Sequence, residues 1–254
     1  MGNYLNQRIF VPSKGLDVVP QEVGLGHEEV RIISADGTEI HGWFFPQQGQ
    51  GTFIFFHGNA GNVSYYLDLI PPLQTGLGLS ILLFDYRGYG MSEGSPNERG
   101  VYLDAAAAVD WVKRRTESNR IVYYGLSLGA AIAIEMALKD PPAALIVEAA
   151  FTSISEMAVL SSPVVGFLAR PWLRGRFDNM SKVSSLEVPT LFVHGDDDQV
   201  VPFEHSLQLY RAAARGREFY GVPGAGHTQS MFVGEERYLG RLRNFIKCAF
   251  SQGG

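Results

Sequence analysis

The feature that most constrains the fold of this chain is a short apolar run that leads into a serine flanked by glycines. Residues 121–124 have the composition of a buried strand, Gly125-Leu126-Ser127-Leu128-Gly129 follows, and residues 130–138 form a helical segment of small residues. In so tight a turn, a side chain at either glycine would collide with neighbouring backbone. A serine between a strand and the N-terminus of a helix indicates a nucleophile.

The rest of the chain alternates between strand-like and helix-like segments. Two alternating apolar runs, 28–33 and 39–45, flank an Asp36-Gly37 turn and predict an antiparallel hairpin. Continuous apolar runs then indicate strands buried on both faces. The order predicts an α/β fold, with a mostly parallel, doubly wound sheet of about eight strands. We expect further strands at 52–56, 80–84, 121–124, 143–147, 190–193 and 218–220, and helices at 63–73, 98–114, 130–138, 203–214 and 235–250.

Length and composition favour one domain, 1–254, with a short cap at about 151–188. The chain has 254 residues, of which 46% are hydrophobic, enough for one large core. The segment 151–188 contains Pro163, Pro171 and Trp172 and lacks a strand pattern. Because it is long for a loop, we expect short helices over the carboxyl edge of the sheet, where open α/β sheets bind ligands.

Charge and patterning exclude several classes of protein. The formal net charge is −5 and no basic cluster stands out, so nucleic acid is not an expected partner. No run approaches the roughly 20 apolar residues that span a bilayer. We therefore expect a cytoplasmic protein, or a membrane-associated one if an N-terminal anchor has been removed from the chain. The single cysteine, Cys248, excludes an internal disulfide, and its apolar surroundings predict a buried side chain.

A serine hydroxyl is a weak nucleophile and needs a base within hydrogen-bonding distance. His227 follows the last short strand in a glycine-rich loop. His57 and His194 each follow a buried strand and are rivals by position. His57 precedes the serine, whereas a nucleophile on a strand-to-helix turn is ordinarily followed by the acid and then the histidine. His194 adjoins the candidate acids and would leave His227 without a role. His227 is the predicted base.

The acid that orients the base should follow the strand 190–193, where Asp196, Asp197 and Asp198 stand in succession. An EF-hand loop would need alternating ligands, a glycine at the sixth position and a glutamate at the twelfth, and this spacing fails. We expect no metal site. Asp198 is the predicted acid and Asp196 the alternative. The remaining carboxylates are expected to cap turns or face solvent.

Backbone amides should stabilise the oxyanion of an acyl-transfer reaction. One is that of Leu128, which follows the nucleophile. The other belongs to the loop at 57–62, whose sequence is H-G-N-A-G-N. We predict Asn59 as this donor, with Ala60 as the alternative. No Gly-Lys-Ser/Thr follows the loop, so neither nucleotide binding nor any other cofactor is expected.

Five motifs in this order, between residues 28 and 250, resemble the α/β-hydrolase superfamily. The first two are similar to those of small serine hydrolases that include bacterial esterases and depalmitoylase-like proteins. The resemblance supports Asp198 as the acid and implies structural roles for Asp85 and Arg87. The cap is short compared with many lipase lids, and the cysteine-rich N-terminus and membrane helix of some relatives are absent. The motifs are H-G-N-A-G-N at 57–62, D-Y-R-G-Y-G-M-S at 85–92, G-L-S-L-G at 125–129, H-G-x-x-D-x-x-V-P at 194–202 and G-H at 226–227.

The resemblance and the residues together imply a serine carboxylesterase that forms an acyl-enzyme on a small-molecule substrate. A short to medium acyl chain is expected from apolar residues around the site, namely Leu126, Leu128, Phe151, Phe167 and Trp172. A thioesterase acting on an acyl thioester or an acylated protein is the alternative, because the same site serves either leaving group. A peptidase, a lactonase, a cofactor-free haloperoxidase and a non-catalytic binding scaffold are further alternatives. The sequence does not predict an oligomeric state.

Overall fold

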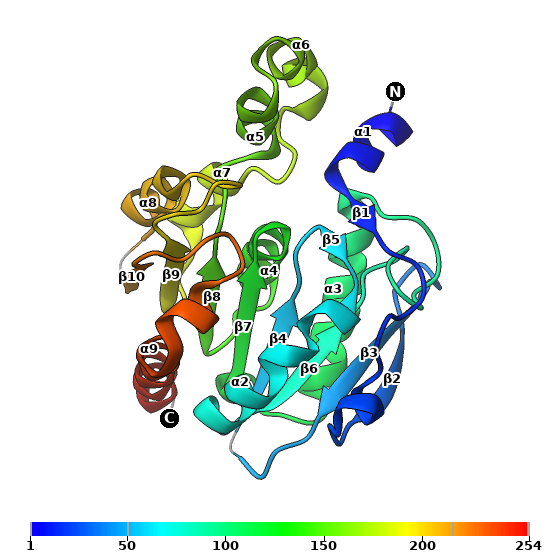
Figure 1. Ribbon diagram of the computed structural model, residues 1–254, viewed down its shortest axis with the longest axis vertical. Coiled ribbons are helices and arrows are strands. Elements are labelled where there is room, and N and C mark those ends of the chain that lie inside the picture. Colours follow the sequence, from blue (N-terminus) through cyan, green and yellow to red (C-terminus); the bar gives the residue numbers. More distant parts are fainter. Residues whose placement is uncertain (1, 50, 215, 253–254) are drawn as a thin grey trace.

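The computed structural model describes residues 2–49, 51–214 and 216–252, with only the backbone of residues 2–5. Its main feature is an eight-stranded sheet in the order β10-β9-β8-β7-β4-β6-β3-β2 (Figure 1). The strands are β2 (Glu28–Ile33), β3 (Glu39–Phe45), β4 (Thr52–Phe56), β6 (Ser80–Phe84), β7 (Ile121–Leu126), β8 (Ala144–Glu148), β9 (Thr190–Gly195) and β10 (Arg217–Val222). β2 pairs antiparallel with β3 and β3 with β6, whereas all other pairs are parallel. The predicted fold class is confirmed.

Helices cover both faces of the sheet, as a doubly wound fold requires. One core cluster takes side chains from α3 (Glu98–Lys113), α4 (Leu128–Lys139) and α8 (Phe203–Ala212). The other takes them from α2 (Ile70–Leu77) and α9 (Ser230–Gln252). Successive side chains of each central strand alternate between the two clusters. None of the described helices combines the length and the apolar character needed to cross a membrane.

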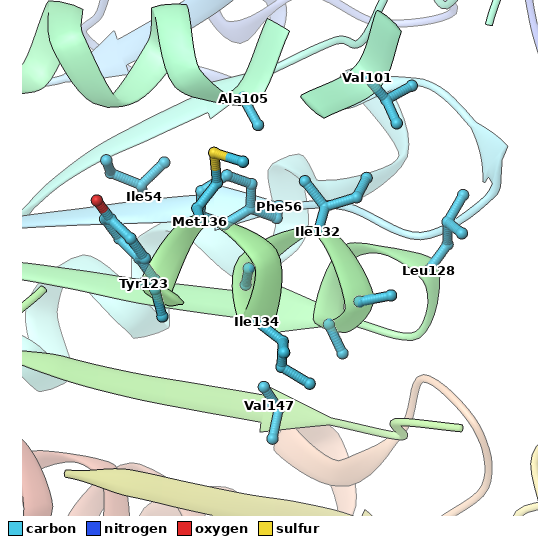
Figure 2. Packing of buried hydrophobic residues seen from close by; sticks show 14 of the residues in the cluster. Ile54, Phe56, Val101, Ala105, Tyr123, Leu128, Ile132, Ile134, Met136 and Val147 are labelled. Atoms are coloured by element: carbon cyan, nitrogen blue, oxygen red, sulfur yellow. The ribbon is translucent and has the colours of Figure 1, made fainter. Parts of the chain in front are cut away.

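Helix α4 matters most for the site because Ser127 immediately precedes it. Figure 2 shows Ile132 and Met136 on the side of α4 toward Ala105 of α3. On another side, Ile134 lies next to Val147 of β8. Packing on both sides fixes the position of α4, and with it the N-terminus that follows the serine.

The segment between β8 and β9 contains α5 (Ile154–Ser161), α6 (Pro163–Leu173), α7 (Asn179–Lys182) and the 3₁₀ helix η4 (Val183–Ser185). In Figure 1, α5 and α6 lie beyond the carboxyl ends of the parallel strands. The two helices approach closely at Gly166, where a Cβ would collide with the Ala158 carbonyl group. Helices therefore occur where the sequence predicts them. The assignment of 1–254 to one domain with a cap at 151–188 stays a prediction, and its two ends lie outside the described residues.

The N-terminal segment forms structure that the sequence did not predict. Helix α1 (Gly2–Ile9) precedes β1 (Val11–Pro12), which pairs in parallel with β5 (Ala60–Gly61). The Val11 amide donates a hydrogen bond of 2.9 Å to the carbonyl oxygen of Asn59. This two-residue strand is too short to show periodicity, yet it fastens the loop at 57–62.

Two helices start several residues away from their predicted positions, whereas α3, α4 and α8 differ from the prediction by two residues or fewer at each end. The segment 63–73 begins as the 3₁₀ helix η2 (Val63–Leu69) and becomes α2 only at Ile70, where prolines suit a first turn because they have no amide hydrogen to leave unpaired. Helix α9 starts at Ser230 and is kinked at Glu235, which has φ 46° and ψ −130°. Two further 3₁₀ helices are η1 (Pro20–Val23) and η3 (Ser118–Arg120).

The predicted burial of Cys248 is wrong, because its side chain is exposed. The buried face of α9 passes through Leu242, Phe245, Ile246 and Ala249, which follow the spacing of one helical face. Position 248 falls beside that face, so the apolar pattern around it did not indicate its own burial.

Candidate active site

Ser127 lies between β7 and α4 in a strained backbone conformation. Its φ is 56° and its ψ is −113°, a region that residues other than glycine rarely adopt. The Ser127 amide donates a hydrogen bond of 2.9 Å to the Glu148 carbonyl oxygen of the neighbouring strand. The sharp turn thus directs the serine out of the sheet and leaves it 9% exposed.

The two glycines of the turn are required by close backbone approach. A Cβ on Gly125 would lie 2.6 Å from the Ala130 Cα atom, and one on Gly129 would collide with the carbonyl oxygen of Phe56. Neither backbone group can move without displacing α4 or β4. The predicted reason for glycine on both sides of Ser127 is confirmed.

The structure brings Ser127, His227 and Asp198 together from three separate segments. The His227 Nε2 atom lies 3.1 Å from the Ser127 Oγ atom. The His227 Nδ1 atom lies 2.7 Å from an Asp198 carboxylate oxygen. With its Nδ1 proton donated to the carboxylate, neutral His227 presents an unprotonated Nε2 that accepts the serine hydrogen.

Asp198 is buried and heavily hydrogen-bonded. The amides of Val200 and Val201 donate to its Oδ1 atom at 2.8 Å and 2.9 Å. Burial alone would raise the pKa of Asp198, but hydrogen bonds from His194 and His227 outweigh it and hold that pKa well below its usual value. The carboxylate is therefore ionised at neutral pH and can stabilise an imidazolium beside it.

His194, one of the rival bases, contacts the acid rather than the serine. Its Nε2 atom lies 3.1 Å from an Asp198 oxygen and 2.8 Å from the Val201 carbonyl oxygen. Because both neighbours are acceptors, Nε2 carries a proton. The Nδ1 atom lies 2.6 Å from the Ser206 hydroxyl oxygen, and that hydroxyl donates to the Ala150 carbonyl oxygen at 3.1 Å. This contact was not predicted from the sequence. The position of His194 at the end of β9, four residues before Asp198, indicates that the two side chains can meet.

His57, the other rival base, is the first residue of the loop at 57–62, and its side chain is buried. Its Nδ1 atom lies 2.8 Å from the Gly58 carbonyl oxygen, and its Nε2 atom lies 3.5 Å from an Asp85 oxygen. No hydrogen bond joins it to Ser127 within the described part of the chain. The contacts of His57 are therefore with its own loop and with Asp85.

The two other carboxylates after β9 bind locally. Asp196 accepts a hydrogen bond of 2.6 Å from the Gly224 amide, and Asp197 accepts one of 2.9 Å from the Gln199 side chain. Both are exposed. Within 2–49, 51–214 and 216–252, no group of three or more His, Cys, Asp or Glu side chains is placed to hold a metal ion.

The two predicted oxyanion donors have amides without a partner. The Asn59 carbonyl oxygen accepts from Val11, and its side chain donates to Ile9 at 3.1 Å. The backbone amides of Asn59 and of Leu128, the first residue of α4, donate to no acceptor among the described residues. Ala60 belongs to β5, which pairs with β1. The roles of both amides stay predictions.

The apolar residues that suggested an acyl site divide into two groups. Leu126, Leu128 and Phe151 are buried in the core clusters, so packing explains their apolar character. The expectation that these three surround the acyl chain is therefore not supported. Phe167 and Trp172 of α6 are 66% and 54% exposed. Of the five predicted residues, only Phe167 and Trp172 have exposed apolar surface.

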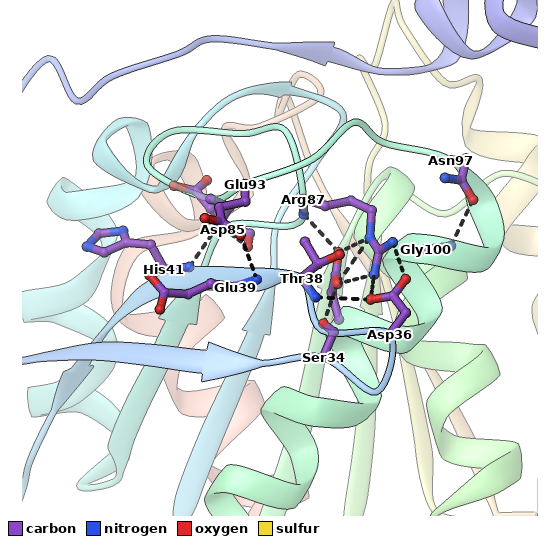
Figure 3. A network of polar contacts seen from close by, with 12 residues as sticks. Ser34, Asp36, Thr38, Glu39, His41, Asp85, Arg87, Glu93, Asn97 and Gly100 are labelled. Carbon is purple, nitrogen blue, oxygen red and sulfur yellow. Dashed lines mark hydrogen bonds and ion pairs between the residues drawn. The ribbon is translucent and has the colours of Figure 1, made fainter.

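Asp85 and Arg87 have the contacts of structural residues, as the resemblance implies. Arg87 forms an ion pair of 2.8 Å with Asp104. A second ion pair, of 2.7 Å, joins Arg87 to Asp36 (Figure 3). The Asp85 carboxylate accepts a hydrogen bond of 3.0 Å from the Val63 amide. These contacts join the hairpin and η2 to the loop after β6.

Comparisons with known proteins agree with the fold. Residues 51–176 match the model of a family described as alpha/beta hydrolase fold. The uncharacterized protein Rv2307c of Mycobacterium tuberculosis is 35% identical over 243 residues, which cover 94% of this chain and 85% of that protein. The alpha/beta hydrolase domain-containing protein WAV2 of Arabidopsis thaliana is 33% identical over 270 residues, covering 94% and 86%.

Solved structures show the same fold at lower identity. The esterase Pf2001 of Pyrococcus furiosus superposes with a TM-score of 0.79 at 19% identity, over 96% of this chain and 98% of that one. An esterase of Exiguobacterium antarcticum gives a TM-score of 0.65 at 19% identity, over 87% and 100%. Because relatives of nearly the same extent exceed 30% identity and the architecture agrees throughout, this chain belongs to the α/β-hydrolase family.

Proposed function

We propose that this protein is a serine hydrolase that cleaves carboxylic esters through an acyl-enzyme intermediate. One observation carries the proposal: a continuous hydrogen-bonded chain runs from the Ser127 hydroxyl through His227 to Asp198, with contacts of 3.1 Å and 2.7 Å. A serine, a neutral imidazole and an ionised carboxylate in this order can generate a nucleophile at neutral pH. The serine's place on a strained strand-to-helix turn supports this role.

In the proposed first step, the Ser127 Oγ atom attacks the ester carbonyl carbon as His227 accepts its proton. Asp198 keeps the imidazole in the required tautomer and stabilises the imidazolium. The tetrahedral intermediate collapses when its C–O bond to the alcohol breaks, and the imidazolium protonates the departing alcohol. Water then attacks the acyl-enzyme by the same route, His227 taking a proton from the water and returning it to Ser127.

Charge develops on the carbonyl oxygen in both steps and requires hydrogen-bond donors. We assign the amides of Asn59 and Leu128 to this role, because each lies beside the site and has no other acceptor among the described residues. The Leu128 amide also opens α4, and a helix N-terminus favours negative charge. Two donors fixed by packed backbone need no rearrangement during the reaction.

The acyl group is proposed to be of short to medium length. The helices α5 and α6 lie beyond the carboxyl ends of the strands (Figure 1). The α6 side chains of Phe167 and Trp172 are exposed. The esterase neighbours with the same architecture support an ester substrate as the first choice.

The test measures turnover of matched oxygen and sulfur esters, with acyl chains from acetyl to dodecanoyl, by wild type and by Ser127→Ala. We expect oxygen esters of the shorter chains to be preferred. Loss of the nucleophile should lower kcat by about 10³-fold or more at unchanged melting temperature. Ser161→Ala, which removes an exposed hydroxyl on α5, is the matched control and should retain wild-type turnover.

Near-wild-type turnover by pure Ser127→Ala would remove the proposal. Absence of turnover by the wild-type protein on every ester and thioester of the panel would favour a binding scaffold. A consistent preference for sulfur esters would keep Ser127 as nucleophile and change the substrate class to thioesters.

A further inference from the structure

Tyr66 lies beside the loop that carries the proposed oxyanion donor, and its hydroxyl has an uncommitted proton. The Gly58 amide donates a hydrogen bond to the Tyr66 hydroxyl oxygen at 3.2 Å. No described residue accepts a hydrogen bond from that hydroxyl. A partly buried O–H group without an acceptor is uncommon, because desolvation of an unpaired donor costs free energy.

The Tyr66 hydroxyl and Ser127 border the same side of Gly58. A Cβ built on Gly58 would lie 3.2 Å from the Tyr66 hydroxyl oxygen and 3.8 Å from the Ser127 Cβ atom. Asn59, whose amide is a proposed oxyanion donor, is the next residue in the chain. The hydroxyl therefore lies on the Ser127 side of the loop that carries the Asn59 amide.

The aromatic ring of Tyr66 is held by its neighbours. Its centroid lies 5.3 Å from that of Phe55 and 5.7 Å from that of the His57 ring. Burial raises the pKa of Tyr66 to about 12, so the hydroxyl keeps its proton throughout the neutral and mildly alkaline range. Tyr66 is thus a neutral donor with a fixed position.

We propose that the Tyr66 hydroxyl donates a third hydrogen bond to the oxyanion of the tetrahedral intermediate, beside the amides of Asn59 and Leu128. This inference rests on the proposed function, because it assigns a residue to the same reaction. By accepting a hydrogen bond from Gly58, the Tyr66 oxygen becomes a better donor through its own proton. Hydrogen bonds from a hydroxyl to an oxyanion are short and strong.

Tyr66→Phe tests the inference because it keeps the ring and removes only the hydroxyl. We expect kcat on an oxygen ester to fall about 10²-fold, with little change in KM, since the bond forms mainly in the transition state. Tyr65→Phe is the matched control. The Tyr65 side chain is exposed, and its loss of a hydroxyl should leave kcat unchanged. Melting curves and titration of reactive serines with a fluorophosphonate correct each rate for folded, competent protein.

A matched ester and thionoester, which carries C=S in place of C=O, separate a donor from a loop support. Sulfur accepts hydrogen bonds more weakly than oxygen, so each donor to the oxyanion increases the preference for the ester. We expect Tyr66→Phe to reduce that preference about tenfold or more. If the hydroxyl only supports the Gly58 amide, both substrates slow equally and the preference is unchanged, which would overturn the inference.

The two levels of the proposal fail in different ways. Turnover by Ser127→Ala would remove the proposed function itself. An inactive Ser127→Ala, together with a Tyr66→Phe variant of wild-type kcat and ester preference, would remove only the role of Tyr66.

Discussion

Two aspartates, Asp198 and Asp104, are buried to the same extent but bind different partners. Both carboxylates are fully buried, and both accept several hydrogen bonds. Asp104 binds the Arg87 guanidinium at 2.8 Å and the Ser34 hydroxyl at 2.6 Å. Asp198 instead contacts two imidazoles, those of His227 and His194.

The partner decides what each carboxylate can do. A guanidinium keeps its charge at every accessible pH, so Arg87 does not exchange a proton with Asp104. An imidazole gains and loses a proton near neutral pH, so His227 beside Asp198 can transfer one. Burial of a carboxylate alone therefore does not indicate a reactive site. A titratable partner that also reaches a hydroxyl does.

Among substitutions of these carboxylates, the largest effect is expected from Asp198→Asn. An amide cannot stabilise the imidazolium and favours the wrong tautomer of His227, so kcat should fall about 10⁴-fold. Steady-state kinetics on the preferred ester measure this loss. A decrease of less than about tenfold would mean that Asp198 has no more influence on the reaction than an ordinary buried carboxylate.

Asp104→Asn is the matched substitution in the structural pair. It leaves the buried Arg87 guanidinium with only the half-exposed Asp36 as counter-charge. We expect the free energy of unfolding to fall by about 3 kcal/mol, because removing one partner of a buried ion pair leaves a charge without compensation. Urea denaturation measures it. The kcat of the folded variant should match wild type, and a large fall in kcat at full folding would break the distinction between the two aspartates.

A smaller effect is expected at Glu148, whose contribution to stability changes with pH in the opposite direction to that of Asp198. Its carboxylate accepts hydrogen bonds from Tyr238 at 2.6 Å and Tyr124 at 2.9 Å, and burial raises its pKa. Because the folded-state pKa exceeds the unfolded value, the stabilisation is complete below the unfolded pKa and is lost as pH rises through the folded one. For Asp198, whose pKa is lowered, stabilisation is present above the unfolded pKa and is lost as pH falls.

Glu148→Gln should therefore flatten the dependence of stability on pH above the usual glutamate range. Free energies of unfolding from urea titrations, at pH values from mildly acidic to neutral, measure the slope for wild type and variant. Identical slopes would show that Glu148 does not change its proton affinity on folding.

The sequence predicted the parts of the molecule that repeat a simple physical rule. Buried parallel strands appear as continuous apolar runs, and the ends of such strands meet at one edge of a sheet. Ser127, Asp198 and His227 each follow a predicted strand, which is why their convergence could be expected. The structure also distinguishes Asp198 from Asp196, because Asp198 contacts His227 whereas Asp196 binds the Gly224 amide.

Other features had no periodic signal. The pairing of β1 with β5 depends on two residues at each strand, too few to show an alternation. The position of Tyr66 beside Gly58 depends on the course of η2 after the loop. This segment is a 3₁₀ helix, whereas the sequence predicted an α-helix. At Cys248 an apolar pattern was present but misleading, because neighbouring residues in the sequence lie on several faces of a helix and only one of these faces is buried.

Labelling with a fluorophosphonate, followed by peptide mass spectrometry, shows directly whether Ser127 is an activated nucleophile. Only a serine activated by a base reacts rapidly with this reagent. We predict one adduct per chain, on Ser127, formed rapidly in wild type and slowly in Asp198→Asn. An unmodified Ser127 in a preparation that still hydrolyses esters would contradict the account.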